Sequence, residues 1–154
     1  MLYDEKTTMK RGRQHTAWAA TFATAAELSR RGYDVAFTMG NTPRTDLLCA
    51  VPDGKPFKVQ VKGISNQNAF YAQKEFFEAP TQKDLYLVVV LVTSDVEQLA
   101  LRFFILTHEE AQKEFANMPK TKKDGRPYES GFGLNWGSIT RYENKWTSFP
   151  KLNR

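Results

Sequence analysis

The chain has 154 residues, of which 41% are hydrophobic and 13% aromatic, so it is long and apolar enough to bury a core and is unlike a disordered segment. Its longest apolar run, 85–92, has strand length and falls short of the roughly 18 apolar residues that a membrane helix needs, so no membrane contact is expected. A net charge of +5 and a pI near 9.3 permit a nucleic-acid partner without requiring one.

Residues 1–13 are polar and basic and are expected to form a loose arm. They lack the apolar centre of a signal peptide. The single cysteine, Cys49, excludes an intrachain disulfide and lies in an apolar run, where a buried and inert thiol is expected. Together these features predict a cytoplasmic protein.

An alanine-rich segment, 14–31, predicts a helix that ends at Gly32, a residue suited to a helix C-cap. Small and apolar residues recur along it at helical spacing, which predicts a wide apolar face packed closely on a sheet. The alternating residues 33–37 predict a strand, followed by a turn at 40–43. The residues of the apolar face form two sets: Ala17, Ala20, Thr21, Thr24 and Leu28, and Trp18, Phe22 and Ala25.

Two β-rich runs, 47–51 and 57–63, flank the turn sequence Pro52-Asp53-Gly54-Lys55 and predict a β-hairpin. Side chains alternate along a strand, so Gln60 and Lys62 share one face of the second arm. Pairing of the two arms brings Asp46, which precedes the first arm, back towards both residues.

An acid, an amide oxygen and an ammonium on one patch are a minimal set for holding a divalent metal beside a phosphodiester. Asp46 is a hard oxygen ligand suited to Mg²⁺, Gln60 offers its carbonyl oxygen, and the backbone carbonyl of Val61 completes the ligand set. Lys62 orients the attacking water or stabilises developing charge. The spacing alone also fits an ordinary strand start at Asp46 and a solvated face at Gln60 and Lys62.

The segment 65–80 fits either a short helix or an irregular connection around its aromatic residues. The continuously apolar run 85–92 predicts a central strand covered on both faces, and 101–106 predicts another strand. Thr107 is expected to cap a helix through Asn117, with Glu109 and Glu110 placed favourably in its first turn.

The C-terminal segment 127–154 is rich in aromatic residues and is expected to pack on the core. Its apolar residues are Phe132, Leu134, Trp136, Ile139, Tyr142 and Trp146. The order of helix, three strands, an intervening segment and further strands predicts one mixed α/β domain over residues 1–154.

Three stretches, 25–35 (AAELSRRGYDV), 44–47 (RTDL) and 59–63 (VQVKG), resemble the PD-(D/E)XK nuclease superfamily. The likeness is to its Q-x-K branch, which includes homing endonucleases of group I introns and many small proteins. It covers residues 17–63. The resemblance implies a restriction-endonuclease-like core, with an N-terminal helix followed by a central mixed β-sheet and flanking helices.

In this family the aspartate binds metal, the Q or E position contributes to the same site, and the lysine is catalytic. These roles fall on Asp46, Gln60 and Lys62. The resemblance therefore implies hydrolysis of phosphodiester bonds with Mg²⁺ or Mn²⁺, and DNA is the expected substrate. A homodimer is one expected assembly, because cutting two strands takes two sites.

Active members commonly carry a further acid on the first helix, whereas residues 14–26 contain no carboxylate. Glu27 and His15 are the nearest candidates for a ligand, although a solvated glutamate and a surface or capping histidine are the commoner situations. The alternative function is a catalytically inactive nuclease-fold module that binds nucleic acid or a protein partner. A third is an interaction or oligomerisation protein with an exposed aromatic patch within 70–77 or 132–146.

Basic residues outside the hairpin are candidate phosphate contacts, with solubilising surface lysines as the alternative. Gln67 and Tyr71 match a Q-x-x-x-Y element found in some nucleases of the superfamily, a pattern that also arises by chance. The three tryptophans are expected in the core rather than as stacking platforms. The candidate phosphate contacts are Arg11, Arg13, Arg44, Lys120, Lys122, Lys123 and Arg126, and Lys74, Glu75 and Glu78 are candidates to border the site.

Overall fold

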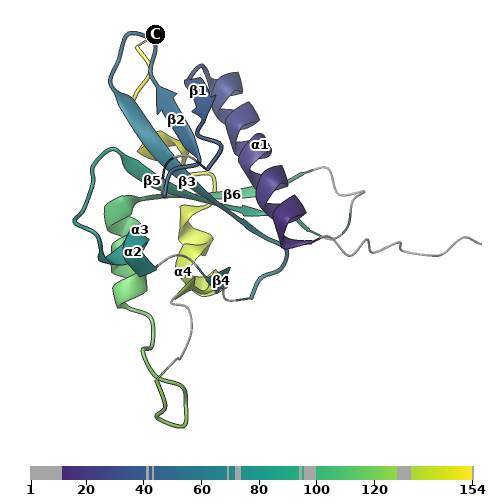
Figure 1. The fold of residues 1–154 in the computed structure, drawn as a ribbon, viewed down its shortest axis with the longest axis vertical. Coiled ribbons are helices and arrows are strands. Elements are labelled where there is room, and N and C mark those ends of the chain that lie inside the picture. Colours follow the sequence, from purple (N-terminus) through teal and green to yellow (C-terminus); the bar gives the residue numbers. More distant parts are fainter. Residues whose placement is uncertain are drawn as a thin grey trace, which may run out of the picture.

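A five-stranded mixed β-sheet lies at the centre of the protein, with α1 on one face and α2, α3 and α4 on the other (Figure 1). The computed structural model describes residues 12–40, 42, 44–68, 70–71, 74–93, 95, 100–127 and 133–153. The predicted mixed α/β class is confirmed. The helices are α1 (Arg13–Arg31), α2 (Lys74–Glu78), α3 (His108–Ala116) and α4 (Trp136–Ile139), with 3₁₀ turns η1 (Thr140–Tyr142) and η2 (Trp146–Ser148).

The strand order across the sheet is β1-β2-β3-β5-β6. Strands β1, β2 and β3 form an antiparallel meander, β3 runs parallel to β5, and β5 is antiparallel to β6. A separate two-stranded sheet joins β4 to β7. The strands are β1 (Asp34–Phe37), β2 (Leu47–Ala50), β3 (Pro56–Ile64), β4 (Phe70–Tyr71), β5 (Leu85–Leu91), β6 (Arg102–Thr107) and β7 (Gly133–Leu134).

The predicted hairpin is β2 and β3, paired with Leu47 opposite Val59. Val59 and Val61 point into the core beneath α1, so Gln60 and Lys62 lie on the opposite face of the sheet. The register therefore decides which side of the sheet carries the candidate catalytic groups, as the alternation of the sequence predicts.

Helix α1 packs very closely on β3 because the facing residues are small. A Cβ on Gly63 would lie 2.6 Å from the carbonyl oxygen of Thr16 and 3.0 Å from the Cβ of Ala20, so only glycine fits beneath the helix. Gly32 ends α1 in the left-handed region at φ 103°, and its N–H bonds the carbonyls of Leu28 and Ser29, so the predicted C-cap is confirmed.

The predicted wide apolar face of α1 is only half correct. Its buried residues are Thr16, Ala20, Thr24, Ala25 and Leu28. By contrast, Trp18 is 36% exposed and Phe22 is 55% exposed, so the expectation that all three tryptophans lie in the core is wrong for Trp18. Helix α1 buries the side that faces the central strand β3, whereas Phe22 lies on the flank that contacts Phe37 of β1. Strand β1 has only four residues and forms the edge of the sheet in the described part of the chain, so it covers little of that flank.

The predictions for the centre of the chain are confirmed. Every side chain of β5 is buried, as expected of a strand covered on both faces, and β6 follows it. Thr107 caps α3 in a capping box with Glu110: each side chain bonds the backbone N–H of the other residue. The segment 65–80 contains β4 and the short helix α2 rather than an irregular connection alone.

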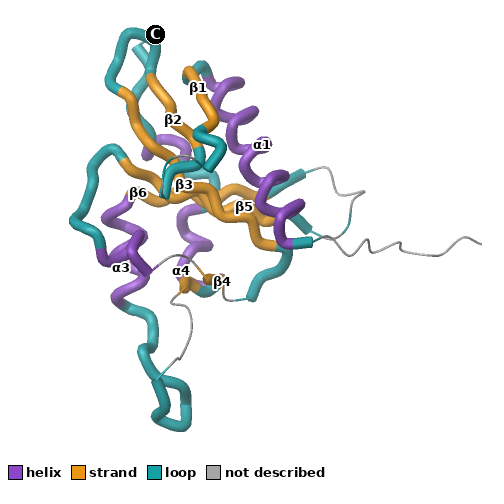
Figure 2. Tube along the Cα trace, viewed as in Figure 1, coloured by secondary structure: helices purple, strands orange, loops and turns teal. Residues whose placement is uncertain are grey.

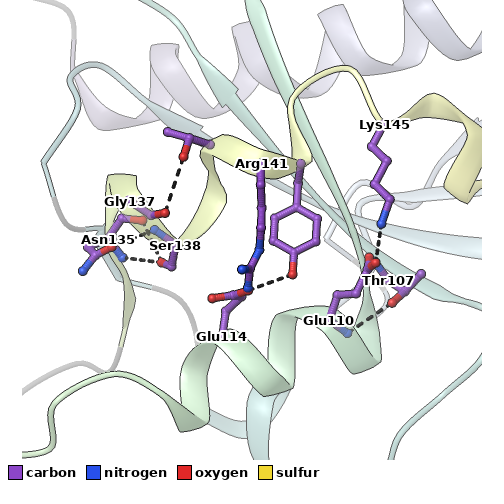
Figure 3. Close-up of polar contacts among 10 residues, drawn as sticks. Thr107, Glu110, Glu114, Asn135, Gly137, Ser138, Arg141 and Lys145 are labelled. Atoms are coloured by element: carbon purple, nitrogen blue, oxygen red, sulfur yellow. Dashed lines mark hydrogen bonds and ion pairs between the residues drawn. The ribbon is translucent and has the colours of Figure 1, made fainter.

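The C-terminal segment folds back on the core, as predicted, and Leu134, Ile139, Tyr142 and Trp146 are buried. Polar contacts tie it to α3 (Figure 3): the carboxylate of the buried Glu114 accepts a hydrogen bond from the Tyr142 hydroxyl at 2.8 Å and pairs with Arg141. Lys145 pairs with Glu110, so the residue that caps α3 also anchors the C-terminal segment.

Several predictions concern residues outside the described ranges. These are the arm up to residue 11, including Arg11, the residues Asn41 and Pro43 of the turn at 40–43, and Phe132. Arg13, predicted to end the arm, is the first residue of α1. Among the helices of the described residues, none is both long and apolar enough for a transmembrane span.

Candidate active site on the β2–β3 hairpin

Asp46 immediately precedes β2, where the chain arrives from loop 38–45. Its backbone N–H donates to the carbonyl of Val59 at 2.9 Å, and its own carbonyl accepts from the N–H of Thr38 at 3.1 Å. Both neighbouring strands therefore fix the Asp46 backbone, and the side chain is held where β2 begins.

The Asp46 side chain, and not a backbone carbonyl, accepts a backbone N–H of β3. Its Oδ2 accepts the backbone N–H of Val61 at 2.7 Å and the Gln60 Nε2 at 2.9 Å. The Thr38 hydroxyl donates to the carbonyl of Thr45 at 2.5 Å, so the residue before Asp46 is tied to the residue that follows β1. The arrangement confirms that the hairpin brings Asp46 and Gln60 into contact.

Gln60 holds the one unsatisfied group of the site. Its Oε1 is the only buried side-chain nitrogen or oxygen, among the described residues, without a hydrogen-bond partner. The amide Nε2 donates to Asp46 Oδ2. If the amide were flipped, its oxygen would lie against Oδ2, and two hydrogen-bond acceptors would face each other. A buried acceptor without a donor costs about 1–3 kcal/mol, and a bound cation is one way to satisfy it.

Burial shifts the two ionisable groups of the site in opposite directions. It raises the pKa of Asp46, and the Val61 N–H and the nearby Lys62 ammonium only partly oppose it. It also lowers the pKa of Lys62; repulsion from Arg13 adds to this effect, and attraction to Asp46 opposes it. Shifts of both an acid and a base at one half-buried position are typical of functional sites.

The residues present match a hard divalent cation in kind but supply little charge. Asp46 and Gln60 offer side-chain oxygens, and the Val61 carbonyl lies on the same edge of β3 as its N–H, since both groups of a strand residue point to one side. Across the described part of the chain, no group of three or more His, Cys, Asp or Glu residues forms a metal cluster. A cation at this position would rest on one carboxylate and would need further oxygens from a substrate.

Neither candidate for an additional ligand on α1 is placed as an acid of the site. Glu27 pairs with Arg30 at 2.6 Å and with Arg31 at 3.0 Å in the last turn, and these ion pairs lower its pKa. His15 is exposed in the first turn. Glu27 is therefore half-buried and held in ion pairs within α1, rather than freely solvated.

Two described residues between β1 and Asp46 adopt a strained backbone that the sequence does not signal. Met39 at φ 52° and Arg44 at φ 61° both adopt the left-handed backbone conformation that side chains disfavour. Thr38 closes the loop through its hydroxyl and its N–H, as described above. Sequence reasoning missed Thr38, because a threonine after a strand belongs to no motif; only the contact across the loop identifies it.

Should a divalent cation bind at Asp46, we expect Thr38→Val to weaken that binding several-fold while changing the free energy of unfolding by only about 1 kcal/mol. Valine keeps the shape of threonine and removes the hydroxyl that holds the Thr45 carbonyl, so Asp46 becomes less well positioned. Calorimetric titration with Mn²⁺ measures the effect. Thr21→Val is the matched control, since it removes a comparable bond from Thr21 to the Ala17 carbonyl on α1. Equal metal affinity in both variants would contradict the role of Thr38.

The other candidates lie apart from the hairpin centre. Arg44 is half-buried and its guanidinium donates to the Glu75 carbonyl at 3.4 Å, which connects the Asp46 loop to α2. Lys74 pairs with Glu78 at 3.5 Å on the surface of α2. Gln67 is exposed, and the side chain of Tyr71 lies outside the described residues.

The basic loop after α3 projects away from the sheet (Figure 2), so the structure does not bring it beside Asp46. Its turn is closed by a bridge between Thr121 and Pro127, and Arg126 pairs with Asp124 at 2.6 Å. Any contact of this loop with nucleic acid would occur away from the hairpin. The basic residues of the loop are Lys120, Lys122, Lys123 and Arg126.

Comparison of the chain with protein-family models, with curated proteins and with solved structures found no match.

Proposed function

We propose that the protein is a metal-dependent endonuclease that hydrolyses phosphodiester bonds, with DNA as its substrate, on a restriction-endonuclease-like core. The observation that carries the proposal is the half-buried Asp46 carboxylate beside the unpartnered oxygen of Gln60, with Lys62 on the same face of the sheet. The described order, an N-terminal helix followed by a central mixed β-sheet with flanking helices, agrees with the order that the sequence resemblance implies.

Asp46, Gln60 and the Val61 carbonyl would hold Mg²⁺ or Mn²⁺, which when bound supplies activation of water and neutralisation of phosphate charge. Gln60 stabilises the ionised Asp46 through its amide. Lys62 presents a positive charge to the phosphoryl oxygens, where negative charge increases in the transition state. Arg44, two residues before Asp46, would contact a neighbouring phosphate.

The proposal includes a cytoplasmic setting, which suits the buried free thiol of Cys49, and a homodimer where both strands of a duplex are cut. The single carboxylate of the site favours one competing function, a nuclease-fold module that binds nucleic acid or protein without cleaving. The two functions differ in one measurable property: only the endonuclease needs a metal held by Asp46.

The most direct test restores the second carboxylate. In Gln60→Glu two acidic groups face the same position, and we expect Mg²⁺ and Mn²⁺ to bind at least about tenfold more tightly than to the wild type. Without metal the two carboxylates repel each other, so the melting temperature should fall, and saturating Mg²⁺ should restore it. Calorimetry and thermal unfolding, with and without a short duplex DNA, measure both effects.

The control Gln60→Leu removes the oxygen without adding charge and should bind metal more weakly than the wild type. Nicking of supercoiled DNA in Mg²⁺ or Mn²⁺ should be present in the wild type and absent in Lys62→Ala. Unchanged metal affinity in Gln60→Glu, together with DNA binding that does not depend on Mg²⁺, would contradict the endonuclease function and favour the inactive binding module.

A further inference from the structure

Three aromatic side chains, two on α1 and one at the end of β1, form an exposed row, which we name the aromatic ladder: Trp18, Phe22 and Phe37. The rings of Trp18 and Phe22 stack with centroids 5.3 Å apart. The ring of Phe37 is tilted by 57° against that of Phe22, with centroids 5.4 Å apart. Their exposed fractions are 36%, 55% and 39%, in a chain whose other large aromatic side chains in the described residues are mostly buried.

The ladder begins beside the candidate active site. Phe37 ends β1 and is followed directly by Thr38, whose N–H bonds the Asp46 carbonyl. At its other end, Trp18 follows Arg13 by five residues, about 7–8 Å along the helix axis, and Arg13 lies close enough to Lys62 to repel it. The Asp46 side chain lies on the other face of the sheet, so a strand that passes over the β1 edge would contact both.

Charge on this flank of α1 favours an anionic partner. The helix has no acidic residue in its first turn and none before Glu27, whereas Arg13 and His15 lie at its start. His15 precedes Trp18 by three residues, which places the two on the same side of the helix. The positive charge of Arg13 at the helix start, followed by exposed aromatic rings, combines the two features that bind single-stranded nucleic acid.

A second copy of the chain fits this surface less well than a nucleic acid does. A stable protein interface buries about 800 Å² on each partner, and three partly exposed rings offer far less. The π-face of an unpaired base, by contrast, needs only one ring to stack on.

We infer that the aromatic ladder stacks on unpaired bases of a nucleic acid whose backbone passes the Asp46 centre. The substrate is then single-stranded, or carries unpaired or extruded bases beside the bond to be cut. This inference rests on the proposed function for its choice of nucleic acid.

The test measures binding of fluorescein-labelled dT12 by fluorescence anisotropy, using Asp46→Asn protein so that no cleavage occurs. Phe22→Leu keeps an apolar side chain but removes the π-face, and it should weaken dT12 binding about tenfold. Phe22→Trp keeps the π-face and should bind within about twofold of the parent. A blunt 12-base-pair duplex should bind equally to all three proteins.

Equal dT12 affinity in Phe22→Leu and Phe22→Trp would overturn the inference. So would a sedimentation result in which the parent is a dimer and Phe22→Leu a monomer, because the ladder would then face a second copy. If dT12 affinity depends on Phe22 but metal binding does not depend on Asp46, the inference would be supported and the proposed endonuclease function contradicted. If metal binding depends on Asp46 but dT12 affinity does not depend on Phe22, the endonuclease function would stand and the role of the aromatic ladder would be contradicted.

Discussion

Asp46→Asn is expected to reduce DNA cleavage by about a thousandfold and to weaken Mn²⁺ binding beyond detection, while the protein stays folded. Asparagine is nearly the same shape, and its carbonyl oxygen can still accept the hydrogen bonds from the Val61 N–H and the Gln60 amide. What it loses is the negative charge, and that charge is the only one the site offers to a cation.

The stability of the same variant should be unchanged or slightly higher, by at most about 1 kcal/mol. Burial raises the pKa of Asp46, so in the wild type the native state disfavours the ionised form relative to the unfolded chain. The free energy of unfolding should therefore fall as the pH rises from the pKa of Asp46 in the unfolded chain through its higher pKa in the native state. This loss persists at neutral pH. Asparagine does not ionise, so the loss should be absent in the variant.

Urea unfolding at pH 4 and pH 7, with calorimetric titration of Mn²⁺, measures both parts of the prediction. Asp53→Asn is the matched control: it removes the same charge from the hairpin turn, where φ is 60° and asparagine is well tolerated. Metal affinity should also fall in the wild type as pH drops through the raised pKa of Asp46, because protons compete for the carboxylate. Metal binding that survives in Asp46→Asn would place the cation elsewhere.

The second large effect is expected at Gly63, where α1 lies on β3. The added methyl group of Gly63→Ala would meet the Thr16 carbonyl oxygen at 2.6 Å, and neither atom belongs to a flexible side chain. The helix or the strand must move, at a cost of about 3 kcal/mol in the free energy of unfolding. The proposed metal ligands Gln60 and Val61 lie on the same strand just before Gly63, so the displacement should also lower metal affinity.

Thermal and urea unfolding measure this change directly. Gly137→Ala is the control, since its added Cβ would meet nothing closer than the Asn135 side chain at 3.5 Å. The control should unfold within about 1 kcal/mol of the wild type. If Gly63→Ala is equally stable, the close approach of α1 to β3 is wrong.

Much of the fold could be predicted from local patterns. The Asp-Gly turn between two β-rich runs predicted the hairpin, continuous hydrophobicity predicted the buried β5, and Thr107 with Glu110 predicted the start of α3. Each of these signals involves residues close in sequence, so hydrogen bonding and burial within one element suffice to set them. The patterns failed at α1, where periodicity indicated an apolar face and could not show how much of it the sheet would cover.

The candidate site divides in the same way. The sequence by itself determined that Asp46, Gln60 and Lys62 share one side of a hairpin, because strand alternation and a short turn leave few other arrangements. The tertiary structure alone decided that the Gln60 oxygen has no partner, that Thr38 secures the Asp46 loop, and that Trp18, Phe22 and Phe37 are exposed. Those facts depend on which helices and strands pack together and on where the sheet ends. Contacts between segments that are distant in sequence produce no periodic pattern of residues, so the sequence alone does not reveal them.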